Sequence, residues 1–125
     1  MIRGKFINEN IPIVKIMLGS DQAIQTPNFI LDTGFTGDIQ VTKKVAQDLG
    51  LEITGVVQTT IANGQTVSVK TALAYSTMEG IKRIVNILIS ENMPLVGINF
   101  LKKFSYKAIV DCKNKTVALE RVIWL

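Results

Sequence analysis

The sequence contains no histidine, and this absence removes several kinds of chemistry at once. Without an imidazole the chain cannot build a Ser-His or Cys-His nucleophile pair, and it lacks the commonest metal ligand of proteins. Carboxylates remain as the acid and base groups that can work near neutral pH. We therefore expect any catalysis to depend on carboxylates, with no metal and no other cofactor.

Cysteine and long apolar runs are also nearly absent. The single cysteine, Cys112, cannot form an internal disulfide, and we expect it to be a small buried residue. The N-terminal residues lack the apolar stretch of a signal peptide, and no segment approaches the roughly 18 apolar residues of a membrane span. The sequence therefore predicts a soluble, cytoplasmic protein that does not bind membranes.

Aromatic residues are few, and positive charge is not clustered. The chain has one tryptophan, two tyrosines and five phenylalanines, and its net charge of +4 is scattered along the sequence. Nucleic-acid binding usually needs a basic stripe with interleaved aromatic residues, so we expect no nucleic-acid partner. The length of 125 residues and the 47% hydrophobic content fit a single domain over residues 1–125.

Short runs rich in β-branched residues, separated by turn residues, make up most of the chain. This pattern is typical of an all-β sandwich or barrel. Turn signals separate neighbouring runs at Asp21-Gln22, Asn63-Gly64 and Lys113-Asn114-Lys115. The predicted strands are Ile2 to Ile7, Ile11 to Leu18, Ile24 to Leu31, Val56 to Ala62, Gln65 to Ala74, Ile81 to Ser90, Ala108 to Cys112 and Thr116 to Arg121.

Two segments depart from the strand pattern. Thr42 is placed as an N-cap and Gly50 as a left-handed C-cap, which predicts a two-turn helix from Thr42 to Leu49. The apolar residues of Asn99 to Phe104 recur at spacings of three and four, which predicts a second short helix.

The strongest candidate for a functional site is Asp32-Thr33-Gly34, which directly follows the apolar run Phe29-Ile30-Leu31. This position would hold a carboxylate rigidly at the end of a buried strand. An isolated Asp-Thr-Gly is usually an ordinary turn. Two later segments accompany this one, however: the hairpin signal Asn63-Gly64 and the apolar segment Pro94 to Leu101, which contains Gly97.

Together these three segments resemble the retropepsin-like aspartic proteases, the small single-domain relatives of the pepsin fold. Phe29 to Gly37 is similar to the catalytic loop of that family. Thr59 to Val67 is similar to its flap, the hairpin that closes over substrate. Pro94 to Leu101 is similar to the apolar-apolar-Gly segment that packs behind the catalytic loop. The resemblance spans roughly Ile11 to Glu120.

The resemblance implies a closed or sandwich-like acid protease barrel with one or two short helices and one flap hairpin per subunit. It also implies a homodimer that cleaves a peptide or protein substrate, because each chain supplies only one Asp32 and the reaction needs two carboxyl groups. Two carboxyls about 3 Å apart share one proton, so one can act as base and the other as acid.

Each site residue receives an expected role from the resemblance. Asp32 performs the chemistry, Thr33 locks the two catalytic loops together across the dimer axis, and Gly34 donates its N–H to the carboxylate. Gly97 supports the loop from behind. The residues expected to contact substrate are Phe35, Thr36, Ala62, Asn63, Gly64 and Gln65.

The chain departs from the viral pattern beside the motif. Viral members carry Ala and then Asp after the Asp-Thr-Gly, and an Arg after the later glycine pairs with that Asp; the matching residues here are Phe35, Thr36 and Ile98. Both partners of the ion pair are replaced together, so no buried charge is left unpaired. Phe-Thr-Gly after the motif is more similar to the cellular, prokaryotic branch of the family.

Three other aspartates and the C-terminal end complete the expectations. Asp38, Asp48 and Asp111 are predicted to be surface or capping residues. Viral retropepsins interleave their terminal strands in the dimer. The apolar end of this chain, Val117 to Leu125, could pack on a partner in that way, or Trp124 could cover the core of its own monomer.

Two further functions stay open at this stage. A catalytically silent module of the same fold could bind peptide or protein segments in its cleft, although an intact Asp-Thr-Gly favours the enzyme. A basic β-barrel that binds single-stranded nucleic acid would need surface aromatic residues on a basic groove, and the sequence offers no clear candidates for them.

Overall fold

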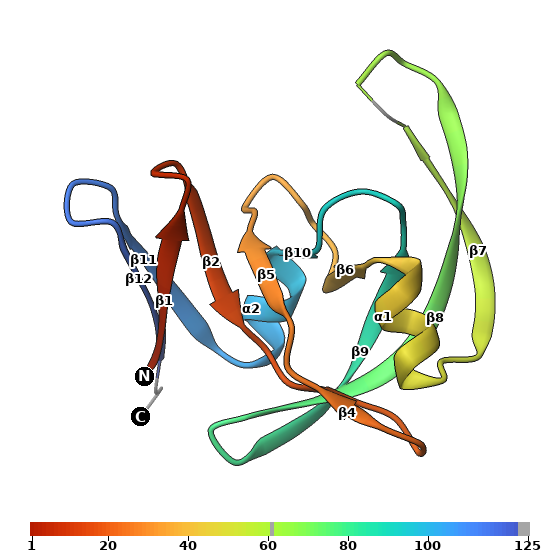
Figure 1. Cartoon of the computed structure of the whole chain (residues 1–125), viewed down its shortest axis with the longest axis horizontal. Coiled ribbons are helices and arrows are strands. Elements are labelled where there is room, and N and C mark those ends of the chain that lie inside the picture. The colour runs from red at the N-terminus through yellow and green to blue at the C-terminus, as the bar shows by residue number, and fades with distance from the viewer. Residues whose placement is uncertain (61, 123–125) are drawn as a thin grey trace.

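The computed structural model describes residues 1–60 and 62–122. Within these residues the chain forms strands along most of its length and two short helices (Figure 1). In chain order the elements are β1 Ile2–Ile7, β2 Ile11–Lys15, β3 Leu18–Gly19, β4 Ile24–Gln25, β5 Asn28–Leu31, β6 Ile39–Val41, α1 Lys43–Leu49, β7 Ile53–Thr60, β8 Thr66–Met78, β9 Ile81–Ile89, β10 Leu95–Val96, α2 Ile98–Lys103, β11 Tyr106–Asp111 and β12 Thr116–Arg121.

The strands form one strongly bent sheet. Its order is β11-β12-β1-β2-β5-β10-β6-β9-β8-β3-β4, and β7 pairs with β8 beside this path. Most neighbours are antiparallel, but β10 runs parallel to β5 and β6 runs parallel to β9. The all-β prediction is confirmed; over the described part of the chain the sheet is not closed, since β11 and β4 end the path.

Strand β8 joins the core to a projecting hairpin. Its residues 70–78 pair with β9, and its residues 66–72 pair with β7. Alternate residues are buried from Ala72 to Met78, whereas none is buried between 66 and 71. The outer half of the β7–β8 hairpin therefore extends beyond the core, as the green arm in Figure 1 shows.

The predicted strands match the structure most closely at the two ends of the chain, and the predicted run Ile11 to Leu18 is divided into β2 and β3. The bounds of β1 and β12 are those predicted. The run Ile24 to Leu31 splits into β4 and β5, since Pro27 lacks a backbone N–H and interrupts the ladder. The prediction missed β6 and β10, because two or three residues carry too little alternation to be read from sequence.

One core unites residues from both halves of the chain. Its largest fully buried side chains include Phe29 of β5 and Phe100 of α2, and the Phe100 ring lies 4.7 Å from that of Phe104.

The prediction that Cys112 is buried was wrong. The residue is exposed, because β11 ends at Asp111 and Cys112 begins the turn before β12. None of the helices over the described residues is long and apolar enough to cross a membrane.

Strand β12 lies between β11 and β1 of its own chain. Ile2 faces Leu119 and Lys5 faces Thr116 in the β1–β12 ladder, and Leu119 is fully buried. The described part of the C-terminal end therefore packs inside the monomer. The predictions for Trp124 and its neighbours fall on residues 123–125, which lie outside the described residues.

Helix α1 has the predicted caps. The Thr42 hydroxyl accepts a hydrogen bond from the Val45 N–H at 3.3 Å, and Gly50 is left-handed with φ of 66°. The Gly50 N–H donates to the Gln47 carbonyl at 2.9 Å. Both ends of this short helix are thus stabilised by the residues that the sequence indicated.

Replacement of the N-cap tests this assignment. We expect Thr42→Ala to lower the free energy of unfolding by about 1 kcal/mol, because the Val45 N–H loses its acceptor. Thr42→Ser keeps an acceptor oxygen and should retain most of the stability. Urea unfolding of the three proteins measures the difference, and equal losses in both variants would rule out the capping bond as its source.

Candidate active site

The loop that carries the Asp-Thr-Gly begins at the end of β5. Phe29 and Leu31 of this strand are buried in the core, and Asp32 follows as a half-buried residue. The Asp32 N–H donates to the Val96 carbonyl of β10 at 3.0 Å. The backbone of Asp32 is thereby tied to a neighbouring core strand, which fixes the point from which its side chain projects.

The three motif residues form a tight turn around the carboxylate. The Gly34 N–H donates to Oδ1 of Asp32 at 2.9 Å, and the Phe35 N–H donates to the Asp32 carbonyl at 3.1 Å. These two bonds hold the Asp32 side chain and the turn in one arrangement. Thr33 and Gly34 are both exposed at the tip of the turn.

Gly97 lies directly behind this loop. A Cβ atom at Gly97 would collide with the backbone oxygens of Phe35 and Gly37, so a side chain cannot be accommodated without moving the loop. Three hydrogen bonds complete the contact: the Gly97 N–H donates to the Asp38 carbonyl at 3.0 Å, the Ile98 N–H to the Phe35 carbonyl at 2.9 Å, and the Asn99 N–H to the Gly37 carbonyl at 3.2 Å. The close approach explains why glycine is needed here.

The ring of Phe35 packs against two glycines. Cβ atoms built at Gly37 and at Gly97 would both overlap this ring. Phe35 is half-buried, whereas its neighbour Thr36 is exposed. The Phe35 ring therefore helps to fill the space behind the loop, in addition to any contact that it makes with substrate.

Asp38 is a buried carboxylate, and the prediction that it lies at the surface was wrong. The residue is 2% exposed. Its side chain accepts hydrogen bonds from the Asn86 N–H at 2.8 Å and from Nδ2 of Asn99 at 2.5 Å, and Nζ of Lys103 lies 2.6 Å from Oδ2. Lys103 also donates to the Ile84 carbonyl at 3.1 Å. The carboxylate thus joins the Asp32 loop to β9 and α2.

Sequence reasoning missed this network, although a signal was present. Asn99 and Lys103 are four residues apart in the predicted second helix and so lie on one face of it. Nothing in the neighbouring sequence links Asp38 to this face, because the strand that follows it, β6, was itself not predicted. The other two aspartates are as predicted: Asp48 is exposed and pairs with Lys44 at 3.1 Å, and Asp111 caps the turn that follows β11.

The hairpin tip carries the four residues that were predicted to contact substrate. All four are exposed, and side-chain bonds order the turn: the Gln65 N–H donates to Oδ1 of Asn63 at 2.9 Å. Gly64 is left-handed with φ of 85° and has open space around it. The Asp32 loop and this tip both project toward the upper side of Figure 1. The residues concerned are Ala62, Asn63, Gly64 and Gln65.

Asp32 has no second carboxylate bonded to it over residues 1–60 and 62–122. Its side chain receives the Gly34 N–H, and neither a hydrogen bond nor an ion pair links it to another acidic residue of that part. The same residues contain no group of three His, Cys, Asp or Glu side chains that could hold a metal ion. Within the described residues Asp32 is thus a single carboxylate held by the backbone of its own loop.

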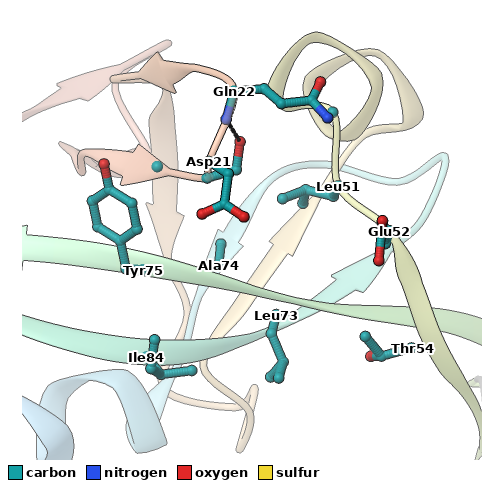
Figure 2. A pocket seen from close by; sticks show the side chains of 12 residues that line it. Asp21, Gln22, Leu51, Glu52, Thr54, Leu73, Ala74, Tyr75 and Ile84 are labelled. Atoms are coloured by element: carbon teal, nitrogen blue, oxygen red, sulfur yellow. Dashed lines mark hydrogen bonds between the residues drawn. The ribbon is translucent and has the colours of Figure 1, made fainter.

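Of two surface hollows, one lies next to the Asp32 loop and the other does not. One, of about 420 Å³, lies beside the base of the β7–β8 hairpin, where Asp21 and Glu52 face Leu73 and Tyr75 (Figure 2). It contains no residue of the Asp32 loop. The other, of about 520 Å³, includes Thr33 and lies between that loop, α2 and β11. Only the second adjoins the candidate active site.

Comparison with known proteins gives a match in structure. No family model matches the sequence, and no curated protein matches it. Among solved structures, the chain is similar to the EIAV protease complexed with the inhibitor HBY-793, with a TM-score of 0.62 and 18% sequence identity over 84% of this chain and 98% of that chain. This likeness to a retroviral protease shows that the chain has a retropepsin-like fold.

The buried ion pair can be tested with two neighbouring lysines. We expect Lys103→Met to destabilise the protein by about 3–5 kcal/mol, because it leaves the Asp38 carboxylate buried without its cation. The matched control is Lys102→Met on the same helix, where the lysine is exposed and the change should cost less than about 0.5 kcal/mol. Urea unfolding measures both, and equal effects would contradict a structural role for the pair.

Proposed function

We propose that the chain is a homodimeric aspartic endopeptidase, with one Asp32 from each subunit forming the active site. The observation that carries this proposal is the Asp32 carboxylate itself. It is held at the end of a core strand, it accepts the Gly34 N–H, and it belongs to a chain with the fold of a retroviral protease. The exposure of Thr33 and Gly34 leaves this turn accessible to a second copy.

The reaction needs two carboxyl groups in opposite protonation states. The ionised carboxyl takes a proton from a water molecule as the water oxygen attacks the peptide carbonyl carbon, and the protonated carboxyl donates its proton to the carbonyl oxygen. In the tetrahedral intermediate the first carboxyl gives its new proton to the peptide nitrogen, and the second takes a proton back from a hydroxyl of the intermediate. The C–N bond then breaks, and an amine and a carboxylic acid are released. Both roles can be filled by Asp32, since two neighbouring carboxyls share one proton.

The hairpin tip fits the role of a lid in this proposal. An extended peptide can receive main-chain hydrogen bonds from a strand hairpin, and closure of the hairpin excludes water from the carboxyl pair. Asn63 and Gln65 order the turn through their side chains, and Gly64 leaves space at its apex. Phe35 and Thr36 beside the loop would then contact the side chains of the peptide and set the sequence preference.

A peptide-binding module without catalysis is the alternative. The observation that favours it is that Asp32 stands without a second carboxylate in the described chain. Such a module would bind extended segments in the same cleft and leave them intact. The two functions differ in cleavage and not in binding: both would bind a peptide, but only the enzyme would cut it.

Substitution of Asp32 tests the proposal. We expect Asp32→Asn to lower cleavage of a mixed peptide library by about a thousandfold or more, because the amide cannot exchange the proton. Wild-type cleavage should fall as the pH rises, since ionisation of both carboxyls removes the acid. Mass spectrometry of the library at several pH values measures both effects.

Asp21→Asn serves as the matched control, since Asp21 is an exposed aspartate of the hollow beside the hairpin base. It should cleave the library at the wild-type rate. Equal traces of cleavage by wild type and Asp32→Asn would contradict the enzyme and favour the peptide-binding module.

A further inference from the structure

A third hollow, of about 270 Å³, lies between β1 and β2 and is lined by positively charged side chains. Arg3, Lys5 and Lys15 line it together with Asn28 of β5, and all four residues are exposed. The β1–β2 ladder ends at Lys5 and Ile13, and the two strands diverge away from their shared turn (Figure 1). We call this site the basic hollow.

The strand ladders place these side chains on one face of the sheet. Lys5 lies opposite Ile13 in the β1–β2 ladder, and Lys15 lies opposite Asn28 in the β2–β5 ladder. Arg3 is two residues from Lys5, and Lys15 is two residues from Ile13, so all of them project to the same side. The three cations therefore stand over one hollow although they come from two strands.

The floor of the basic hollow is an isoleucine that is buried outside the main core. Ile13 is only 4% exposed, yet it does not belong to the core cluster that contains its neighbour Val14. Long cationic side chains lay their aliphatic stems along apolar surface and keep their charged ends in water. Packing of this kind over Ile13 restricts the three side chains, which lowers the entropy that a ligand loses for them on binding.

No carboxylate balances these charges within residues 1–60 and 62–122. None of the three cations of the basic hollow forms an ion pair there. The acidic residues nearest in the sheet have other partners: Glu9 lies 3.4 Å from Lys115, and Glu120 lies 3.4 Å from Lys107. Because like charges on neighbouring strands repel each other, an anion in the hollow would remove an unfavourable interaction.

We propose that the basic hollow binds a phosphate group, either as the free ion or as a phosphate monoester on a peptide side chain. The Arg3 guanidinium can donate two parallel hydrogen bonds to phosphate oxygens, and the ammonium groups of Lys5 and Lys15 supply further charge. The Asn28 amide adds a neutral donor. This inference does not depend on the proposed function, because the hollow contains no residue of the Asp32 loop.

The charges and donors of the hollow favour phosphate over other anions. A phosphate monoester carries roughly −1.5 to −2 charges at neutral pH and several acceptor oxygens, whereas a carboxylate carries a single charge. A single-stranded nucleic acid would also need aromatic side chains on which its bases could stack. The aromatic residues of β1, β2 and β5 are Phe6 and Phe29, and both pack in or against the core.

Removal of charge with retention of the aliphatic stems gives the first test. We expect Arg3→Met/Lys15→Met to raise the dissociation constant for inorganic phosphate at least about tenfold, because two charged donors are lost. The control is Arg83→Met/Lys113→Met, which removes the same charges from exposed positions outside the hollow and should bind phosphate as the wild type does. Isothermal titration calorimetry at constant ionic strength measures binding, and circular dichroism checks that both variants are folded.

Urea unfolding separates a binding role from a structural one. In chloride buffer without phosphate, Lys15→Met should leave the unfolding midpoint unchanged or raise it, because it removes a repulsion. In saturating phosphate the wild type gains stability by mass action, and the variant should fall below it. The general stabilising effect of phosphate acts on both proteins and so cancels in the comparison. An equal loss of stability in both buffers would show that Lys15 is only structural and would contradict the site.

Two peptides distinguish the sources of the phosphate group in the same calorimetry. One carries a phosphoserine and the other carries serine at that position. Tighter binding of the phosphopeptide than of inorganic phosphate would assign the hollow to a modified side chain, and the reverse order would assign it to the free ion.

Three results would overturn the proposal. The first is that neither inorganic phosphate nor the phosphopeptide binds to the wild type. The second is that the two peptides bind equally, or that the control variant loses as much affinity as Arg3→Met/Lys15→Met. The third is that only a single-stranded oligonucleotide binds through these residues, which would make the hollow part of a nucleic-acid site.

Discussion

The contact between the Asp32 loop and the segment that contains Gly97 is the constraint on which the candidate site depends. Backbone hydrogen bonds from Asp32 to Val96 and from Gly97 and Ile98 back to the loop fix two irregular segments to each other. A side chain at Gly97 would force them apart. Because β10 is also a core strand between β5 and β6, the position of the carboxylate is set by the packing of the sheet and not by the loop alone.

A network of side chains around Asp38 supports the same contact between loop and segment. Asp38 ends the loop, and Asn99 and Lys103 lie on the helix that begins after Gly97, so their bonds join the segments that the backbone already holds together. Loss of Lys103 would leave the Asp38 carboxylate buried without its cation, so the junction between loop and helix depends on both partners being present.

The sequence was most informative where a local rule decides the structure. The caps of α1, the bounds of β1 and β12 and the Asn63-Gly64 turn depend on neighbours in sequence, and they agree with the structure. Asp38 and Cys112 were misjudged because their burial depends on distant partners and on where a strand ends. The strand β10 was missed because its two residues show too little alternation, and its parallel partner β5 is far away in the chain.

Because β12 lies between two strands of its own chain, the monomer can fold before it assembles with a partner. In the described monomer β12 pairs with β1 and buries Val117 and Leu119. The hydrophobic core therefore forms within one chain and needs no residue of a partner. A viral-type interleaving of terminal strands would instead make the partner part of the fold. In the proposed homodimer the partner would join a monomer whose β1–β12 pairing is already formed. The fold would then be stable at any concentration, whereas completion of the two-carboxylate site would follow mass action.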